Sequence, residues 1–456
     1  MFLEVEQGHS KFPPVHFTVS GKVAYTVLVN ARMATRRADV VNSGKTDCPW
    51  MCIVFLTEAK LRSPSDLRHC LNHCQRNGRM RCLLCVGFCL TILTTEILLF
   101  SNGKPLLPKP LVLSGLSLDW PCQSTKNIYE ASGRYISRNV IATRAQIFDG
   151  QAILALPRYK PGVPFTLGAL SLKSHSCEPK ITPFPCWAIQ EEGNCQALQS
   201  AVDIVLDIQD ILWVLDVGIV NTLEQPVRRC PPKVVGINAK SGKVVKVIDL
   251  SSLVDVASRL QYMAVDYAED GQVYVYISDA GTGAIIVYNV TTDEGYRVIL
   301  PSAVASGTDK PDALYLALVR RKSCGSTVLY FTYLGSNRMF AIKAVNLRTG
   351  NANGSIVDIG RKRNKIVVLG TDNGSAIFFR LKGDSNIYMW NTDTPFVQDN
   401  FLLVEKAGEC RLPTAVVPGY KDLMWVVESN FQDYIENSVS CSGPSMAIHP
   451  LLNSCS

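Results

Sequence analysis

An apolar–aromatic–apolar–any–polar pattern recurs along the C-terminal three-quarters of this 456-residue chain. A degenerate copy, Ala152–Leu156, lacks the aromatic residue. The fifth positions of successive copies are separated by 60, 63, 54, 58 and 37 residues, which in most intervals leaves room for four short strands and their turns. The pattern therefore predicts an all-β fold, a six-bladed β-propeller with one blade per copy. The clear copies are Leu212–Asp216, Val275–Asp279, Leu329–Tyr333, Ile387–Asn391 and Met424–Glu428.

The sequence between the copies repeats as well. Two of the intervals continue with a pair of runs rich in Val, Ile and Tyr, separated by a turn that contains glycine, as half-buried strands require. Helical periodicity is scarce after Asn139, and Ser251–Leu260 is the best helix candidate. The strand-like runs are Lys233–Asn238 and Lys243–Ile248 after Asp216, and Ala284–Asn289 and Tyr296–Ile299 after Asp279.

Residues 80–93 have the layout of a secretory signal: Met80, a positive charge at Arg81, then an apolar run. We expect translation to start naturally at Met80. The alternatives are an uncleaved signal anchor, for which Glu96 is unfavourable, and a buried core helix. The predicted organisation is a gene-model extension or disordered segment over 1–79, a signal peptide or signal anchor over 80–103, a propeller over 120–440 and a C-terminal tail over 441–456.

The net charge of +7 is concentrated at the beginning of the chain. Residues 1–79 hold 11 Lys and Arg against 6 Asp and Glu, a balance of +5, so only +2 remains for the other 377 residues. Because that remainder has no basic stripe, we predict no nucleic-acid partner. A membrane partner is expected only if the signal segment stays uncleaved.

Nine cysteines follow the signal-like segment, widely spaced and without a CxxC pair, which favours structural disulfides in an oxidising compartment. An odd number leaves at least one thiol free or paired between chains. Three sequons are candidate glycosylation sites of a secreted glycoprotein: Asn289, Asn353 and Asn373. The disulfide candidates are Cys122, Cys177, Cys186, Cys195, Cys230, Cys324, Cys410, Cys441 and Cys455.

Catalytic and metal-binding signals are sparse. Only His175 and His449 follow residue 80, which disfavours a histidine-dependent triad and a His-rich metal site. We therefore predict no metal and no cofactor, and assign no catalytic residue, although a tautomerase using Asp, Tyr or Lys as acid and base stays open.

The polar fifth position of the repeat is the best candidate ligand site. If the strands before it all run toward one rim, the side chains gather there and carboxylates meet a cationic amine. The competing interpretation is structural, because such side chains commonly accept hydrogen bonds from turn amides and fasten neighbouring blades. The residues are Asp216, Asp279, Asn391 and Glu428. The aromatic residues of the repeat are predicted as core between blades rather than a stacking cage: Trp213, Tyr276, Tyr388 and Trp425.

Several motifs, in order along about Trp120–Gln432, resemble the insect yellow and major royal jelly protein family. They are Leu212–Gly218, Cys230–Val235, Tyr276–Asp279, Ile286–Tyr288 and the closing motif Asp422–Gln432. Within the family, Asn139–Ile147 and Leu156–Phe165 resemble the yellow-g branch. One departure is Gln209, which stands where the family usually has the cysteine that pairs with the counterpart of Cys230. Cys230 is thus either the odd thiol or bridged to Cys195 or another cysteine.

The resemblance implies a secreted six-bladed propeller. The yellow-g branch is associated with the eggshell, so the expected function is an extracellular structural or assembly component of the insect eggshell. Its expected partners are eggshell matrix proteins or a paralogous yellow protein. Other members are linked to dopachrome conversion or bind biogenic amines at the mouth of the central channel. The alternative is therefore a protein that binds a small aromatic amine or catechol, or a dopachrome-conversion-type enzyme in pigmentation.

Overall fold

The computed structural model describes residues 110–451 apart from 174–177, 309–311, 322–324, 351, 353, 407, 409 and 420–422. The chain divides into two compact units, Met1–Lys104 and Pro105–Ser456, and the described residues belong to the second. The signal-like segment and the extension before it lie outside them, as do His175, Cys177, Cys324, Asn353 and Cys455. In the part of the chain that is described, no helix is long and apolar enough to cross a membrane.

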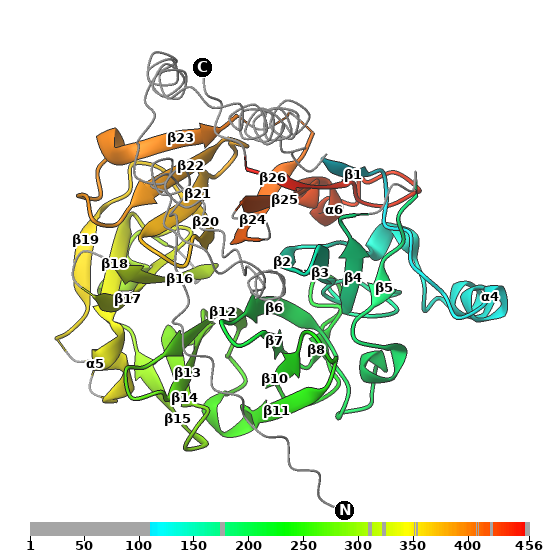
Figure 1. Cartoon of the computed structure of the whole chain (residues 1–456), viewed down its shortest axis with the longest axis horizontal. Coiled ribbons are helices and arrows are strands. Elements are labelled where there is room, and N and C mark those ends of the chain that lie inside the picture. Colours follow the sequence, from blue (N-terminus) through cyan, green and yellow to red (C-terminus); the bar gives the residue numbers. More distant parts are fainter. Residues whose placement is uncertain are drawn as a thin grey trace, which may run out of the picture. The chain divides into compact units, whose positions relative to one another are not determined.

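Six four-stranded antiparallel sheets are arranged around a central axis as the blades of a propeller (Figure 1). Blade 1 contains β2 (Arg144–Phe148), β3 (Gln151–Ala155), β4 (Leu167–Ser171) and β5 (Thr182–Pro183). Blade 2 contains β6 (Ala201–Leu206), β7 (Ile211–Asp216), β10 (Lys233–Asn238) and β11 (Val244–Asp249). Blade 3 contains β12 (Leu260–Tyr267), β13 (Val273–Asp279), β14 (Ala284–Asn289) and β15 (Glu294–Ile299).

The remaining blades follow the same order, from the innermost strand outward. Blade 4 contains β16 (Leu314–Arg321), β17 (Ser326–Tyr333), β18 (Arg338–Lys343) and β19 (Val357–Arg361). Blade 5 contains β20 (Ile366–Thr371), β21 (Ala376–Leu381), β22 (Ile387–Asn391) and β23 (Phe401–Glu405). Blade 6 contains β24 (Leu412–Pro418), β25 (Met424–Ser429), β26 (Met446–Pro450) and β1 (Leu111–Leu113). The six-bladed propeller predicted from the repeat is confirmed.

The innermost strands β2, β6, β12, β16, β20 and β24 contact one another in cyclic order and so close the ring. Outside the blades, β8 (Ile219–Val220) and β9 (Val227–Arg228) form a two-stranded ribbon. The described helices of more than four residues are α4 (Gln123–Ala131), α5 (Ala344–Arg348) and α6 (Phe431–Ile435). The helix expected over Ser251–Leu260 is reduced to a single turn, Ser251–Leu253, because Leu260 already starts β12.

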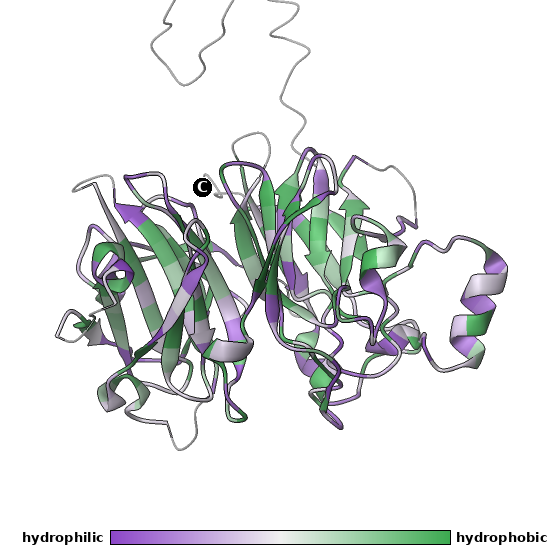
Figure 2. Cartoon of the chain, turned by 90° about the horizontal axis from the view of Figure 1, so that it is seen from below, coloured by the Kyte–Doolittle hydropathy of each residue, from purple (hydrophilic) through white to green (hydrophobic). Residues whose placement is uncertain are grey.

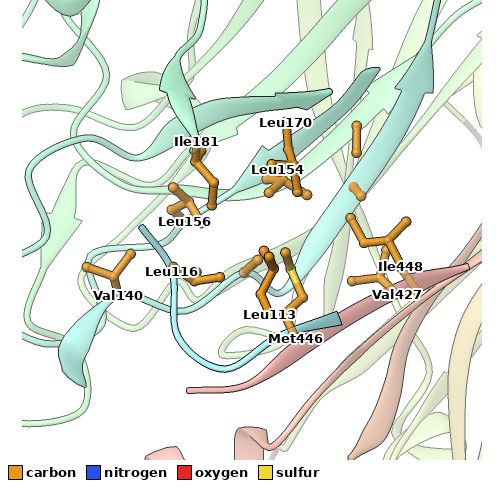
Figure 3. Packing of buried hydrophobic residues seen from close by; sticks show 14 of the residues in the cluster. Leu113, Leu116, Val140, Leu154, Leu156, Leu170, Ile181, Val427, Met446 and Ile448 are labelled. Carbon is orange, nitrogen blue, oxygen red and sulfur yellow. The ribbon is translucent and has the colours of Figure 1, made fainter. Parts of the chain in front are cut away.

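Six hydrophobic clusters hold the ring together, one between each pair of neighbouring blades. Each blade therefore buries both of its faces, which explains why β13 reads as a nearly continuous apolar run with six buried residues rather than an alternating one. Seen from the side, the strands are mostly apolar and polar residues gather in the loops (Figure 2). Leu154 of blade 1 and Val427 of blade 6 belong to one such cluster, to which β1 adds Leu113 (Figure 3).

Two sequence predictions need correction. The propeller does not end at residue 440, because β26, inside the expected tail, pairs with β25, and β1, before the expected start, pairs with β26. The copy at Ile387–Asn391 is β22, the third strand of its blade, whereas the other copies lie on second strands. The second strand of blade 5 is β21, whose sequence AIFFRL is just as apolar and aromatic, so composition alone does not separate the two.

Candidate functional site

The six innermost strands begin at one face of the ring, which we call the proximal face. Ala201 at the start of β6 pairs with Asp216 at the end of β7, and Leu260 at the start of β12 pairs with Asp279 at the end of β13. The same antiparallel relation recurs in every blade. The start of each inner strand and the end of each second strand therefore share the proximal face, and the other ends share the distal face.

A buried ion pair lies in the channel on the proximal side. Arg144 is the first residue of β2 and Asp203 is the third of β6, with Nε 3.5 Å from Oδ1 and side-chain exposures of 14% and 10%. Asp203 Oδ2 accepts a hydrogen bond from the Met263 amide at 2.8 Å. Arg144 Nη1 donates to the Thr414 carbonyl at 2.6 Å. The pair thus connects inner strands of blades 6, 1, 2 and 3.

Aromatic side chains continue the site on blades 3 and 4. The rings of Tyr262 and Tyr315 lie 4.8 Å apart between centroids, at an interplanar angle of 30°. The guanidinium carbon of Arg144 lies 4.8 Å from the centroid of the Tyr262 ring, within the range of a cation–π interaction. Burial raises the pKa of both hydroxyls, so each stays protonated at neutral pH and can donate a hydrogen bond.

The same burial sets the acid–base properties of the ion pair. Desolvation raises the pKa of Asp203 to about 6, although Arg144 and the amides of Met263 and Ile204 favour its charged form. Desolvation works against the charge of Arg144, but Asp203 and the neighbouring tyrosines together outweigh it and the pKa of the guanidinium is raised. Asp203 therefore exchanges a proton close to neutrality, beside a cation that stays charged.

These residues line a channel cavity of about 130 Å³, to which all six inner strands contribute. It extends from Arg144, Asp203, Tyr262 and Tyr315 to Arg320 and Asn373 on the distal side. One carboxylate, one guanidinium and two tilted phenol rings are the groups that would contact a small aromatic molecule with a charged or ionisable substituent, in a volume below the roughly 300 Å³ at which ordinary ligand pockets begin.

Asp216 is placed on the proximal face as predicted, but its carboxylate is already in use. It is fully buried and accepts hydrogen bonds from the amides of Gln199 and Ser200, both at 2.8 Å. Lys233 Nζ lies 3.2 Å from Oδ2. Gly218 follows with a φ of 68°, and a Cβ there would lie 2.1 Å from the Cys230 carbonyl oxygen. Asp216 therefore stabilises a turn in which position 218 accommodates only glycine.

The Asp279 carboxylate likewise accepts hydrogen bonds from the loops around it. Its Oδ1 accepts the Arg259 amide at 2.7 Å, and its Oδ2 accepts the hydroxyls of Ser258 and Thr282, both at 2.6 Å. The side chain is fully buried. The structural interpretation of the fifth position thus accounts for Asp216 and Asp279 better than the ligand interpretation.

Asn391 lies at the opposite face from the other three candidates. It ends β22, a third strand, and pairs with Ala376 at the start of β21, which places it on the distal face. The prediction that all four side chains gather at one rim is therefore wrong for Asn391. Its Oδ1 accepts the Asp393 amide at 3.0 Å, as in an ordinary turn.

Glu428 belongs to a separate cluster on blades 5 and 6. Ligand atoms of Glu405, Glu428 and His449 lie within 4.8 Å of one another, and Arg411 Nε lies 3.7 Å from Glu428 Oε2. Desolvation alone would lower the pKa of His449, but the hydrogen bond to Glu428 and the charge of Glu405 outweigh it and raise that pKa. His449 and Arg411 thus neutralise the carboxylates, and a metal ion would have to compete with both.

The aromatic residues of the repeat lie where the core prediction placed them. Trp213, Tyr276 and Trp425 are buried in three different inter-blade clusters, and Tyr388 packs against a fourth. The Trp213 indole donates to Asp207 at 2.7 Å and the Tyr276 hydroxyl to Asp266 at 2.8 Å. None of the four forms a cage in the channel.

Cys230 is bridged to Cys195, one of the alternatives left open by the sequence, with the Cα atoms 5.3 Å apart. The other four described cysteines are exposed and carry no disulfide: Cys122, Cys186, Cys410 and Cys441. Of the described sequons, Asn373 lies in an exposed turn. Asn289 is buried, and its amide donates to the Tyr274 hydroxyl at 3.2 Å, so it is an unfavourable glycosylation site in the folded protein.

The residues of the channel site were not among the sequence candidates. Arg144, Tyr262 and Tyr315 come from the first strand of their blades, which the repeat does not mark. Asp203 carried a usable signal, because it interrupts the otherwise apolar run Ala201–Leu206. A charged residue inside a strand of this kind is usually buried with a partner.

The comparisons with known proteins agree on one family. The family model described as Major royal jelly protein matches residues 199–448, more than half of the 456 residues. Major royal jelly protein 1 of Apis mellifera is 23% identical over 360 residues, 73% of this chain and 80% of that protein. Dopaminechrome tautomerase of Drosophila melanogaster is 28% identical over 172 residues, 37% of each chain. Protein yellow of Drosophila melanogaster is 26% identical over 256 residues, 52% of this chain and 47% of that protein. The matched part thus spans less than half of the tautomerase and of yellow.

Proposed function

The chain belongs to the major royal jelly protein family, and from that premise we propose that it is an extracellular protein whose channel binds a small aromatic amine or catechol. The observation that carries the proposal is the buried Arg144–Asp203 pair beside the adjacent, tilted rings of Tyr262 and Tyr315. An aromatic ring would pack on the tyrosines, and an ammonium group would face Asp203. The Cys195–Cys230 disulfide is consistent with an oxidising, extracellular compartment.

The same groups support a catalytic variant of this proposal, in keeping with a relative named dopaminechrome tautomerase. A tautomerisation moves a proton from one atom of the substrate to another. Asp203, with a pKa of about 6, is suited to accept and return that proton, and Arg144 is suited to stabilise an oxygen that becomes negative. Arg144, Tyr262 and Tyr315 would position the ring.

The test is isothermal titration with dopamine and with tryptamine, using the secreted protein and the variant Asp203→Asn. Loss of the carboxylate should weaken amine binding about tenfold or more, the worth of one charge-assisted hydrogen bond. Asp399→Asn is the matched control, since that residue is exposed and outside the channel lining. Absence of saturable binding, or equal binding by Asp203→Asn, would refute the proposal. Turnover of dopaminechrome by the wild type, lost in Asp203→Asn, would add the catalytic role.

A second function, a structural or assembly component of the insect eggshell, rests on the resemblance to the yellow-g branch. The observation that favours it is the set of four exposed cysteines without a disulfide, which suits bonds to eggshell matrix proteins or to a paralogous yellow protein. If so, the protein should leave isolated eggshells only after reduction. Extraction in denaturant without reductant would argue against cross-linking. Mass spectrometry of the same material would also locate the mature N-terminus, expected a little beyond residue 100.

A further inference from the structure

A second cavity, separate from the channel, lies between blades 4 and 5. Its volume is about 910 Å³, within the range of sites that hold small ligands. Strands β16, β17, β19, β20, β21, β22 and β23 contribute to its lining, together with the segments between β19 and β20 and between β22 and β23. Neither the family's repeat nor the channel site accounts for a hollow of this size, which is seven times the channel cavity's 130 Å³.

Aromatic side chains form a continuous wall of this cavity. Trp390 packs edge-on against Phe396 with ring centroids 4.8 Å apart and against Tyr330 at 5.4 Å. Phe401 contacts Phe396 at 5.1 Å and Phe379 at 5.0 Å. Trp390 and Phe396 are 1% and 6% exposed, so the surface open to an apolar ligand is that of the partly buried Tyr388 and Phe401 and the exposed Val397. Because these side chains rest on rings that hold one another in place, little side-chain entropy is lost on binding.

Positive charge borders this wall. The lining includes Arg321, Arg361 and Arg363, and among the described residues that line it none is a carboxylate. Arg321 is paired with Asp393 at 3.0 Å, so Arg361 and Arg363, both exposed, supply the excess charge. Lys362 between them adds little, because it is buried on the Tyr333 carbonyl and desolvation lowers its pKa to about 7.

We propose that this cavity binds an amphiphile with one anionic head group, of the fatty-acid class. The apolar chain lies along Tyr388, Phe401 and Val397, which cover the buried Trp390 and Phe396, and the carboxylate pairs with Arg361 and Arg363. A guanidinium matches the geometry of a carboxylate, with two parallel hydrogen bonds. A neutral lipid would leave both arginines unused. This inference concerns a site outside the channel and does not depend on the proposed function.

The test uses 11-(dansylamino)undecanoate, a fluorescent fatty acid, titrated into the full secreted protein. We expect saturable binding, displacement by dodecanoate, and displacement by dodecanol at least about tenfold weaker, since the alcohol lacks the charge. The double variant Arg361→Ala/Arg363→Ala should weaken binding by about tenfold or more. Lys240→Ala/Lys243→Ala is the matched control, because it removes the same charge from exposed positions on blade 2 and should bind like the wild type.

Both arginines are exposed, so the double variant should keep the near-UV circular dichroism of the wild type, which verifies folding. Dopamine should not displace the probe, because the two cavities share no lining residue. Three results would each overturn the inference: no saturable binding, equal competition by dodecanol, or undiminished binding by the folded double variant. Displacement by dopamine would assign the probe to the channel and would likewise refute it.

Discussion

Arg144 and Asp203 face each other across the boundary between blades 1 and 2, with Nε 3.5 Å from Oδ1. They are 59 residues apart along the chain. Each also contacts a further blade, Arg144 through the Thr414 carbonyl and Asp203 through the Met263 amide. One ion pair therefore carries two duties, fixing the packing of four blades and supplying charge to the channel.

Because the Arg144–Asp203 pair holds four blades together, we expect substitutions of the two residues to lower the free energy of unfolding non-additively. At pH 7.5, Arg144→Met should lower the free energy of unfolding by about 3 kcal/mol, because it leaves the buried carboxylate without its partner. Asp203→Leu should also destabilise, and the double variant should lose less than the sum of the two single losses. Urea denaturation of the four proteins measures this cycle. Strictly additive losses would show that the two side chains do not interact.

The raised pKa of Asp203 predicts a pH dependence of stability. The folded value of about 6 exceeds the usual 3.9 of an unfolded chain, so the folded state binds the proton more tightly. The corresponding contribution, about 3 kcal/mol, is fully present below pH 4 and is lost as pH rises through 6. Urea denaturation between pH 4 and 7.5 should show this decline relative to Asp203→Asn. Identical profiles would place the carboxyl pKa at its ordinary value.

Asp216 should behave as a structural residue. Asp216→Asn removes a buried anion that accepts two amides at 2.8 Å and lies 3.2 Å from Lys233 Nζ. We expect a loss of about 3 kcal/mol, because the ammonium of Lys233 stays buried without its counter-ion. Dopamine affinity of the folded fraction should be unchanged. Weaker dopamine binding at full stability would restore the ligand interpretation of this repeat position.

The Cys195–Cys230 disulfide should stabilise the fold. It spans 35 residues of sequence, and a loop of that length predicts about 4 kcal/mol through the entropy of the unfolded chain. Replacing both cysteines by serine should lower the urea midpoint accordingly. Cys122→Ser is the control, since that thiol is exposed and unbridged. A midpoint unaffected by the double replacement would mean that the bond adds nothing to folding.

The number and order of the blades could be predicted from sequence, because every blade buries a strand on both faces and such strands share one apolar and aromatic pattern. The limit of that signal shows in blade 5, where the third strand, β22, carries the apolar and aromatic pattern that lies on the second strand of the other blades. The ends of the propeller were misplaced for a related reason. Strand β1 has three residues, too few to carry a periodicity.

The residues of the channel site could not be predicted from the repeat, for a physical reason. Arg144, Asp203 and Tyr262 meet only when inner strands of three blades come together, and no spacing along the chain encodes that meeting. The polar ends of the repeat, by contrast, could be located from sequence, and the structural interpretation of Asp216 and Asp279 was the better one. What the pattern could not give was the strand on which Asn391 lies.

The pairing of β1 with β26 has a consequence for biosynthesis. Leu111 and Ile448 are partners in the same ladder, so Leu111 in the first strand of the described fold meets its partner only after 337 further residues (448 − 111) have been made. Blades 1 to 5 can each assemble from contiguous chain, whereas the sixth waits until β26 has been made. Until then the exposed edge of β1 must be kept from other chains, and any protease that trims the N-terminal flank has to stop before Leu111 for the ring to close.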